Sequence, residues 1–137
     1  MGETSRAATV TRISGFRHEA EAGNHGLLVD EPTEKGGGDA GPSPQALLAA
    51  ALASCTAVTM EMYADRKGWD LDGLSVAVDT EGEISKGTKR FEVIIELPGT
   101  LDEEQRDRLL KIAARCPVHR ALTTEQPVEI RTGSTGT

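Results

Sequence analysis

The sequence contains few aromatic residues and few cysteines. Only 3% of its 137 residues are aromatic, and its two cysteines are Cys55 and Cys116. Without aromatic bulk, a core must be built from small and aliphatic side chains, and such a core gains stability from a second copy of the chain. The composition therefore predicts a single domain over residues 1–137 that forms a homodimer. Residues 1–7 and 132–137, approximately, are expected to be flexible ends.

Long apolar runs and net positive charge are also lacking. The first ten residues contain no apolar run typical of a secretory signal, and the longest such run, residues 46–53, is far shorter than the roughly 20 residues of a membrane span. The formal net charge of -7 disfavours nucleic acid and anionic membranes as partners, because both repel an acidic surface. We therefore expect a cytoplasmic protein that binds neither.

Recognisable metal-binding motifs do not occur in the sequence. There is no C-x-x-C or H-E-x-x-H, and His18, His25 and His119 lack the spacing of metal ligands. We therefore expect no metal and no cofactor. In a cytoplasmic protein two cysteines rarely form a structural disulfide, because that compartment keeps thiols reduced.

Hydrophobic periodicity predicts an α+β domain with the element order β-β-α-β-β-α-β. Strands are expected at residues 8–16, 25–29, 74–80, 90–97 and 128–131. The first two strands would form a hairpin around a turn at residues 21–24.

The helices are predicted from their start and stop signals. Ser43 and Pro44 suit the N-cap and first position of a long helix that Gly68 ends. Because the first half of this helix is apolar all round, we expect it to be buried on every side. A second helix follows a capping box at Asp102 and ends near Arg115, and residues 117–122 form a further short helical turn.

The two cysteines have different predicted surroundings. Cys55 lies about three turns into the long helix, where a thiol ordinarily packs as a small apolar group. Cys116 precedes Pro117 and would cap the next helical turn, whose N–H groups lower the pKa of a thiol. Arg115 and His119 add positive charge there, although they equally fit a solvated helix end. If the two sulfurs meet, a peroxide-oxidised thiol can be resolved as a disulfide.

Two motifs resemble the OsmC/Ohr family of thiol-dependent peroxide-handling proteins. Residues 36–56, GGGDAGPSPQALLAAALASCT, are similar to the central helix segment of that family, and residues 116–119, CPVH, resemble its second-cysteine motif. Residues 30–32, DEP, and 62–69, MYADRKGW, are most similar to an OsmC-like branch distinct from the typical organic hydroperoxide reductases. The resemblance extends from about residue 10 to residue 131.

The resemblance implies an intertwined homodimer with two long central helices back to back and two active sites at the interface. It implies that Cys55 is the peroxidatic thiol and Cys116 the resolving thiol. Small organic hydroperoxides are the usual substrates of the family, and a lipoylated protein or a small dithiol regenerates the thiols. The implied function is a thiol peroxidase in oxidative-stress defence.

The sequence departs from the hydroperoxide reductases of the family at two charged positions. Those enzymes carry a Glu directly after the Pro that opens the central helix, where this sequence has Gln45. They also carry an Arg in the first hairpin turn, and the turn predicted at residues 21–24 contains none. Removal of a charged partner costs ~1.5–3 kcal/mol per hydrogen bond. The candidates for the substitute cation are His25, Arg17 and His119, in that order.

Two other functions fit the same sequence. A non-catalytic dimer that binds an apolar small molecule, or senses redox state, is consistent with the missing charges. A thiol hydrolase that uses Cys55 with His119 fits less well, because no acidic residue that would orient the histidine is evident. A depressed pKa at one of the cysteines would favour the enzyme.

Overall fold

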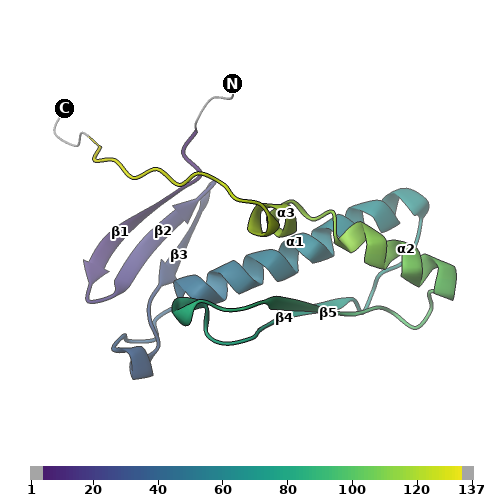
Figure 1. The fold of residues 1–137 in the computed structure, drawn as a ribbon, viewed down its shortest axis with the longest axis horizontal. Helices are drawn as coiled ribbons and strands as arrows, with labels where there is room; N and C mark the ends of the chain where they lie inside the picture. The colour runs from purple at the N-terminus through teal and green to yellow at the C-terminus, as the bar shows by residue number, and fades with distance from the viewer. Residues whose placement is uncertain (1–4, 134–137) are drawn as a thin grey trace. The chain divides into compact units, whose positions relative to one another are not determined.

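The computed structural model describes residues 5–133, which form an α+β fold with the order β-β-β-α-β-β-α-α (Figure 1). The strands are β1 (Ala8–Ser14), β2 (Arg17–Ala22), β3 (His25–Val29), β4 (Ser75–Thr80) and β5 (Phe91–Glu96). The helices are α1 (Pro44–Lys67), α2 (Glu103–Ala113) and α3 (Pro117–Thr123), with short 3-10 turns η1 (Thr33–Lys35) and η2 (Ile84–Lys86). The α+β class predicted from the sequence is confirmed. Residues 1–4 and 134–137, within the predicted flexible ends, lie outside the described residues.

The first predicted strand, residues 8–16, corresponds to β1, and β2 follows it in a segment for which no strand was predicted. Gly15 has a φ of +53°, in the left-handed region that glycine adopts readily, and with Phe16 it makes a turn that ends β1. Arg17 then begins β2, and β1, β2 and β3 form an antiparallel sheet in chain order. The turn predicted at residues 21–24 lies between β2 and β3, so it is the second hairpin turn. The sequence of β2, RHEAEA, does not predict a strand, because Glu and Ala are depleted in strands.

The strand predicted at residues 128–131 is wrong. In the structure this segment is extended without assigned strand pairing, and the side chains of Val128 and Ile130 are 85% and 96% exposed. Alternation of apolar and polar residues favours a strand, but a strand forms only where a neighbouring strand takes its hydrogen bonds. Within the described residues of this single chain no such neighbour is paired with the segment.

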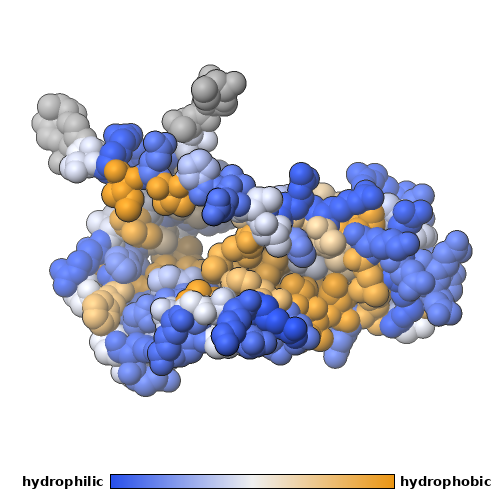
Figure 2. Space-filling model, viewed as in Figure 1, coloured by the Kyte–Doolittle hydropathy of each residue, from blue (hydrophilic) through white to orange (hydrophobic). Residues whose placement is uncertain are grey.

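The chain divides into two compact units, which are described separately. The first comprises Met1–Ala51 and Val78–Glu92, and the second comprises Leu52–Ala77 and Val93–Thr137. The second unit holds an apolar core of buried side chains: Met60, Ala64, Leu101, Leu109 and Ala113. Partly buried aliphatic and aromatic side chains pack around it, and Figure 2 shows apolar surface beside α2 on the face in view.

Helix α1 is exposed over most of its surface, which corrects the expectation that it is buried on every side. Its buried side chains, Leu52, Thr56, Met60 and Ala64, recur every four residues and so lie along one face. In the single chain, the buried side chains of α1 lie on this one face, and the rest of the helix surface is largely exposed. By length and composition α1 would also be able to cross a membrane, but core helices of soluble proteins pass the same test.

Candidate functional site

The first cysteine lies in the middle of α1, as predicted. The helix begins where its signals indicated, because the Ser43 hydroxyl accepts a hydrogen bond from the N–H of Ala46 at 3.1 Å and Pro44 is the first helical residue. Cys55 is half-buried. It follows the buried face of the helix closely, since the next residue, Thr56, is 2% exposed. Cys55 is therefore accessible to a small molecule in the single chain.

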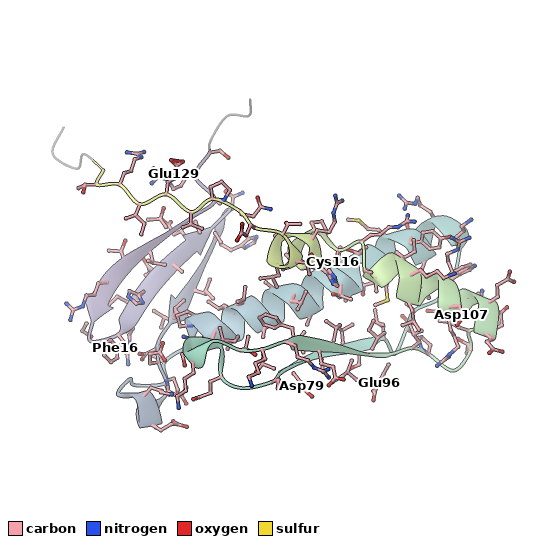
Figure 3. All side chains as sticks on the ribbon, in the orientation of Figure 1. Phe16, Asp79, Glu96, Asp107, Cys116 and Glu129 are labelled. Atoms are coloured by element: carbon pink, nitrogen blue, oxygen red, sulfur yellow. The ribbon has the colours of Figure 1, made fainter. Side chains whose placement is uncertain are left out.

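The second cysteine caps a helix, also as predicted. Cys116 lies between the end of α2 and the start of α3 (Figure 3) and is fully buried. Pro117 occupies the first helical position after it, and the N–H of His119 donates a hydrogen bond to the Cys116 sulfur at 3.3 Å. The imidazole of His119 is not needed for this contact, because the donor is the main chain.

The structure brings the two thiols together in the second unit. The thiols of Cys55 and Cys116 lie close enough that each shifts the pKa of the other. Burial raises the pKa of the Cys55 thiol, and the neighbouring Cys116 thiol raises it further. Burial also acts to raise the pKa of Cys116, but it is outweighed by the Cys55 thiol, main-chain N–H groups and Thr56, so the pKa of Cys116 is lowered.

The Thr56 hydroxyl is a weak cause of that lowered pKa. It has one proton, which it donates to the carbonyl oxygen of Leu52 at 2.8 Å. We therefore assign the lowered pKa of Cys116 mainly to the Cys55 thiol and the N–H of His119. The Cys116 thiol therefore loses its proton more readily than the Cys55 thiol. A further positive charge near Cys55 would favour its ionisation.

Arg17 lies after the first hairpin turn, whereas the sequence predicted that turn later in the chain. It is the first residue of β2 and directly follows the first hairpin turn, whose tip Phe16 marks in Figure 3. The family resemblance implies an Arg at the first hairpin turn. The absence of an Arg was inferred from residues 21–24, which form the second turn of the structure, whereas Arg17 directly follows the first turn. Arg17 moves ahead of His25 and His119 as the candidate cation.

Asp30, which the site prediction omitted, binds Arg17 in the first unit. Its side chain is 1% exposed, and its Oδ2 accepts a hydrogen bond from Arg17 Nε at 3.4 Å. Oδ2 also accepts from the N–H groups of Gly38 and Ala40 at 3.1 and 3.2 Å, and Oδ1 accepts from that of Glu31 at 2.8 Å. Burial acts to raise the pKa of Asp30, but the main-chain donors and Arg17 outweigh it, so the pKa of this carboxyl is lowered.

A sequence signal for Asp30 does exist. It follows the apolar end of β3 and precedes the glycine-rich segment that includes Gly38. A carboxylate next to such a loop is surrounded by main-chain N–H groups that need acceptors. Only the fold shows that Arg17 shares this acceptor.

The other supporting candidates are dispersed. Gln45 is half-buried and lines a pocket of about 420 Å³ in the first unit. The remaining lining residues are Glu31, Pro32, Lys35, Ser43, Ala46, Ala49, Val78, Thr80, Glu83, Ile84 and Ser85. His25 is exposed at the start of β3, and His119 is half-buried in α3. Within residues 5–133, no group of three His, Cys, Asp or Glu side chains is arranged to hold a metal ion.

Comparison with known proteins identifies relatives of this fold. The family model described as OsmC-like protein matches residues 36–131, which is more than half of the chain. No curated protein matches the sequence.

Solved structures share the fold at low identity. A Psychrobacter arcticus protein, proposed to act in the osmotic stress induced and detoxification response, is 23% identical with a TM-score of 0.76, covering 88% of this chain and 90% of its own. An OsmC-like protein of Mycoplasma pneumoniae is 19% identical with a TM-score of 0.69, covering 88% and 89%. An organic hydroperoxide resistance protein of Elizabethkingia anophelis is 24% identical with a TM-score of 0.59, covering 89% and 90%. At these identities the likeness shows the fold alone.

Proposed function

This chain belongs to the OsmC-like protein family, and from this premise we propose that it is a thiol peroxidase that reduces small organic hydroperoxides. The observation that carries the proposal is the proximity of its two cysteines, Cys55 and Cys116, whose thiols shift each other's pKa. The Elizabethkingia neighbour, which is named an organic hydroperoxide resistance protein, supports the substrate class.

The proposed reaction uses both thiols once per turnover. The Cys55 thiolate attacks the outer oxygen of the hydroperoxide, so that an S–O bond forms, the O–O bond breaks and the leaving alkoxide takes a proton to become an alcohol. The Cys116 sulfur then attacks the Cys55 sulfenic acid, forming the disulfide and releasing water. Two thiols have supplied two electrons, and an external dithiol, either small or a lipoylated protein, returns them by thiol–disulfide exchange.

Arg17 supplies the positive charge in this proposal. Cys55 is the accessible thiol, yet its pKa is raised by burial and by Cys116. A guanidinium favours the thiolate and also stabilises the oxygen that leaves. We assign both roles to Arg17 because it directly follows the first hairpin turn, the region in which the family resemblance implies an arginine.

The proposal includes a homodimer formed through α1. Ser54, Val58 and Met62 lie four residues apart on one exposed face, and the two apolar side chains are 41% and 62% exposed. Leu52 of the same helix is 2% exposed in the single chain, so it does not belong to this row. A second α1 would cover the exposed row. A stable monomer in sedimentation at micromolar concentration would contradict this part.

Turnover with a hydroperoxide tests the proposed function. The protein is mixed with cumene hydroperoxide and dihydrolipoamide, and alcohol formation is compared with that of Cys55→Ser. We expect catalytic turnover by the wild-type protein only. Equal rates for the two proteins would reject the peroxidase.

A non-catalytic binding function is favoured by one observation, the pocket of about 420 Å³ lined by Gln45. Its lining includes the apolar side chains of Ala46, Ala49, Val78 and Ile84, so the pocket suits the apolar part of a small molecule. Saturable binding of a fluorescent apolar probe, weakened by Ala49→Trp, combined with no hydroperoxide turnover would favour this function over the enzyme.

A further inference from the structure

We infer that Asp30 and Gly38 are positioning residues that hold the Arg17 guanidinium in one orientation for the peroxidase reaction. This inference rests on the proposed function, because the orientation matters only if Arg17 acts on a thiolate or a leaving oxygen. The two residues are referred to below as the Arg17 support.

The carboxylate of Asp30 is the fixed part of the support. It is almost completely buried, and three main-chain N–H groups, those of Glu31, Gly38 and Ala40, hold its two oxygens. A carboxylate held in this way has little freedom to rotate. Its contact with Arg17 is made through Nε, at 3.4 Å. The carboxylate therefore orients the guanidinium through its inner nitrogen.

Gly38 provides the space in which the guanidinium lies. A Cβ added to Gly38 would be 2.7 Å from Arg17 Nη2 and 3.2 Å from Asp30 Oδ2, closer than real Cβ contacts allow for the first of these. The φ of Gly38 lies outside the left-handed region, so the backbone conformation does not require glycine here. Because Nη2 ends a flexible side chain, a Cβ at this position would displace the guanidinium rather than the loop. The main chain of the loop and the arginine side chain thus pack directly on one another.

The support leaves the outer nitrogens of Arg17 available. The arginine side chain is 39% exposed, and within the described residues its hydrogen bond is made by Nε alone. The two Nη groups form the fork with which arginine binds paired or developing oxygen anions. An arginine that is oriented before the substrate arrives loses less freedom in the transition state. A hydroperoxide oxygen that becomes negative as the O–O bond breaks is the ligand that suits this fork.

The experiment moves the guanidinium without changing its charge. Gly38→Ala pushes against Nη2, whereas Gly99→Ala is the matched control, because a Cβ at Gly99 would meet nothing within 4 Å. Arg17→Met removes the charge, and a double variant combines Arg17→Met with Gly38→Ala. The reaction of each reduced protein with cumene hydroperoxide is followed by stopped flow over a range of pH, and thermal unfolding is recorded alongside.

We expect Gly38→Ala to lower the second-order rate constant about tenfold and Arg17→Met to lower it about a hundredfold. We expect Gly38→Ala to have no further effect in the Arg17→Met background, because its effect passes through Arg17. The apparent pKa of the reacting thiol rises in Gly38→Ala but not in Gly99→Ala. If Gly38→Ala merely disturbed the loop, it would lower the rate constant by the same factor in the wild-type and Arg17→Met proteins. The apparent pKa of the reacting thiol would then stay unchanged.

Two outcomes would overturn the inference in distinguishable ways. If the wild-type protein does not react with the hydroperoxide, the proposed function fails and the inference falls with it. If the wild-type protein reacts and Gly38→Ala reacts equally fast, or if the effects of Gly38→Ala and Arg17→Met simply multiply, the support is rejected while the peroxidase stands.

Discussion

The main-chain N–H of His119 lies 3.3 Å from the sulfur of Cys116 and donates a hydrogen bond to it. With the Cys55 thiol, this donor lowers the pKa of Cys116, while burial and Cys116 raise the pKa of Cys55. The buried thiol therefore ionises more readily than the accessible one. Resolution by Cys116 is favoured in this arrangement, because a thiolate is the attacking form in disulfide formation.

Removal of Cys116 is expected to trap the first oxidation product. Treatment of the wild-type protein with an organic hydroperoxide gives an intramolecular Cys55–Cys116 disulfide, whereas Cys116→Ser leaves Cys55 as a sulfenic or higher acid, because no second thiol can resolve it. Peptide mapping by mass spectrometry distinguishes the products, with Cys55→Ser as the control. Two unmodified thiols after excess oxidant would contradict the assignment.

Asp30 is expected to contribute acid-sensitive stability. Its pKa is lowered from 3.8 in the folded state, so its contribution is present above the unfolded pKa and is lost as pH falls through the folded value. The difference in unfolding free energy between wild type and Asp30→Asn is therefore largest above about pH 5 and shrinks on acidification. Denaturant titrations at several pH values measure it.

Glu83→Gln serves as the control for this titration. Glu83 also has a lowered pKa, caused by Lys86 and Lys35, but its side chain is 50% exposed. Salt at about 1 M screens exposed pairs strongly, so it should abolish the Glu83 effect and leave most of the Asp30 effect. An Asp30 effect that disappears equally with salt would contradict the buried carboxylate as its source.

Gln45→Glu is expected to raise the hydroperoxide rate constant. Arg17 directly follows the first hairpin turn, so we expect it to be the arginine that pairs with a carboxylate introduced at position 45. We expect a gain of about tenfold, equivalent to about 1.4 kcal/mol. Gln126→Glu makes the same charge change at an exposed position. An equal gain in both variants, or a gain that persists in Arg17→Met, would reject the pairing.

The core of the second unit is expected to depend on Leu109 much more than on its neighbour. Leu109 is 0% exposed and Leu110 is 49% exposed. Leu109→Ala leaves a cavity and should lower the unfolding free energy by about 2–5 kcal/mol, whereas Leu110→Ala should change it by about 0.5 kcal/mol or less. Urea unfolding followed by circular dichroism measures both. A comparable loss for Leu110→Ala would show that α2 buries its other face in the folded protein.

The sequence by itself determined the elements whose signals are local. Ser43 and Pro44 begin α1, Gly68 follows its last residue, and Asp102 with Gln105 forms the capping box of α2. These features depend on hydrogen bonds and backbone preferences within a few residues, so a single chain segment specifies them. The same holds for Cys116, whose position before Pro117 was sufficient to predict a helix cap.

Tertiary structure alone decided the features that depend on distant partners. The polar sequence of β2 becomes a strand because β1 and β3 lie on either side of it, and Arg17 therefore directly follows the first hairpin turn. Residues 128–131 carry a strand pattern but no assigned strand pairing within the described chain. Asp30 becomes part of the site because the glycine-rich loop folds back on it, 8–10 residues later in the chain. Hydrophobic and polar patterns indicate which kind of element a segment can form. The segments that it pairs with are decided only when the whole chain folds.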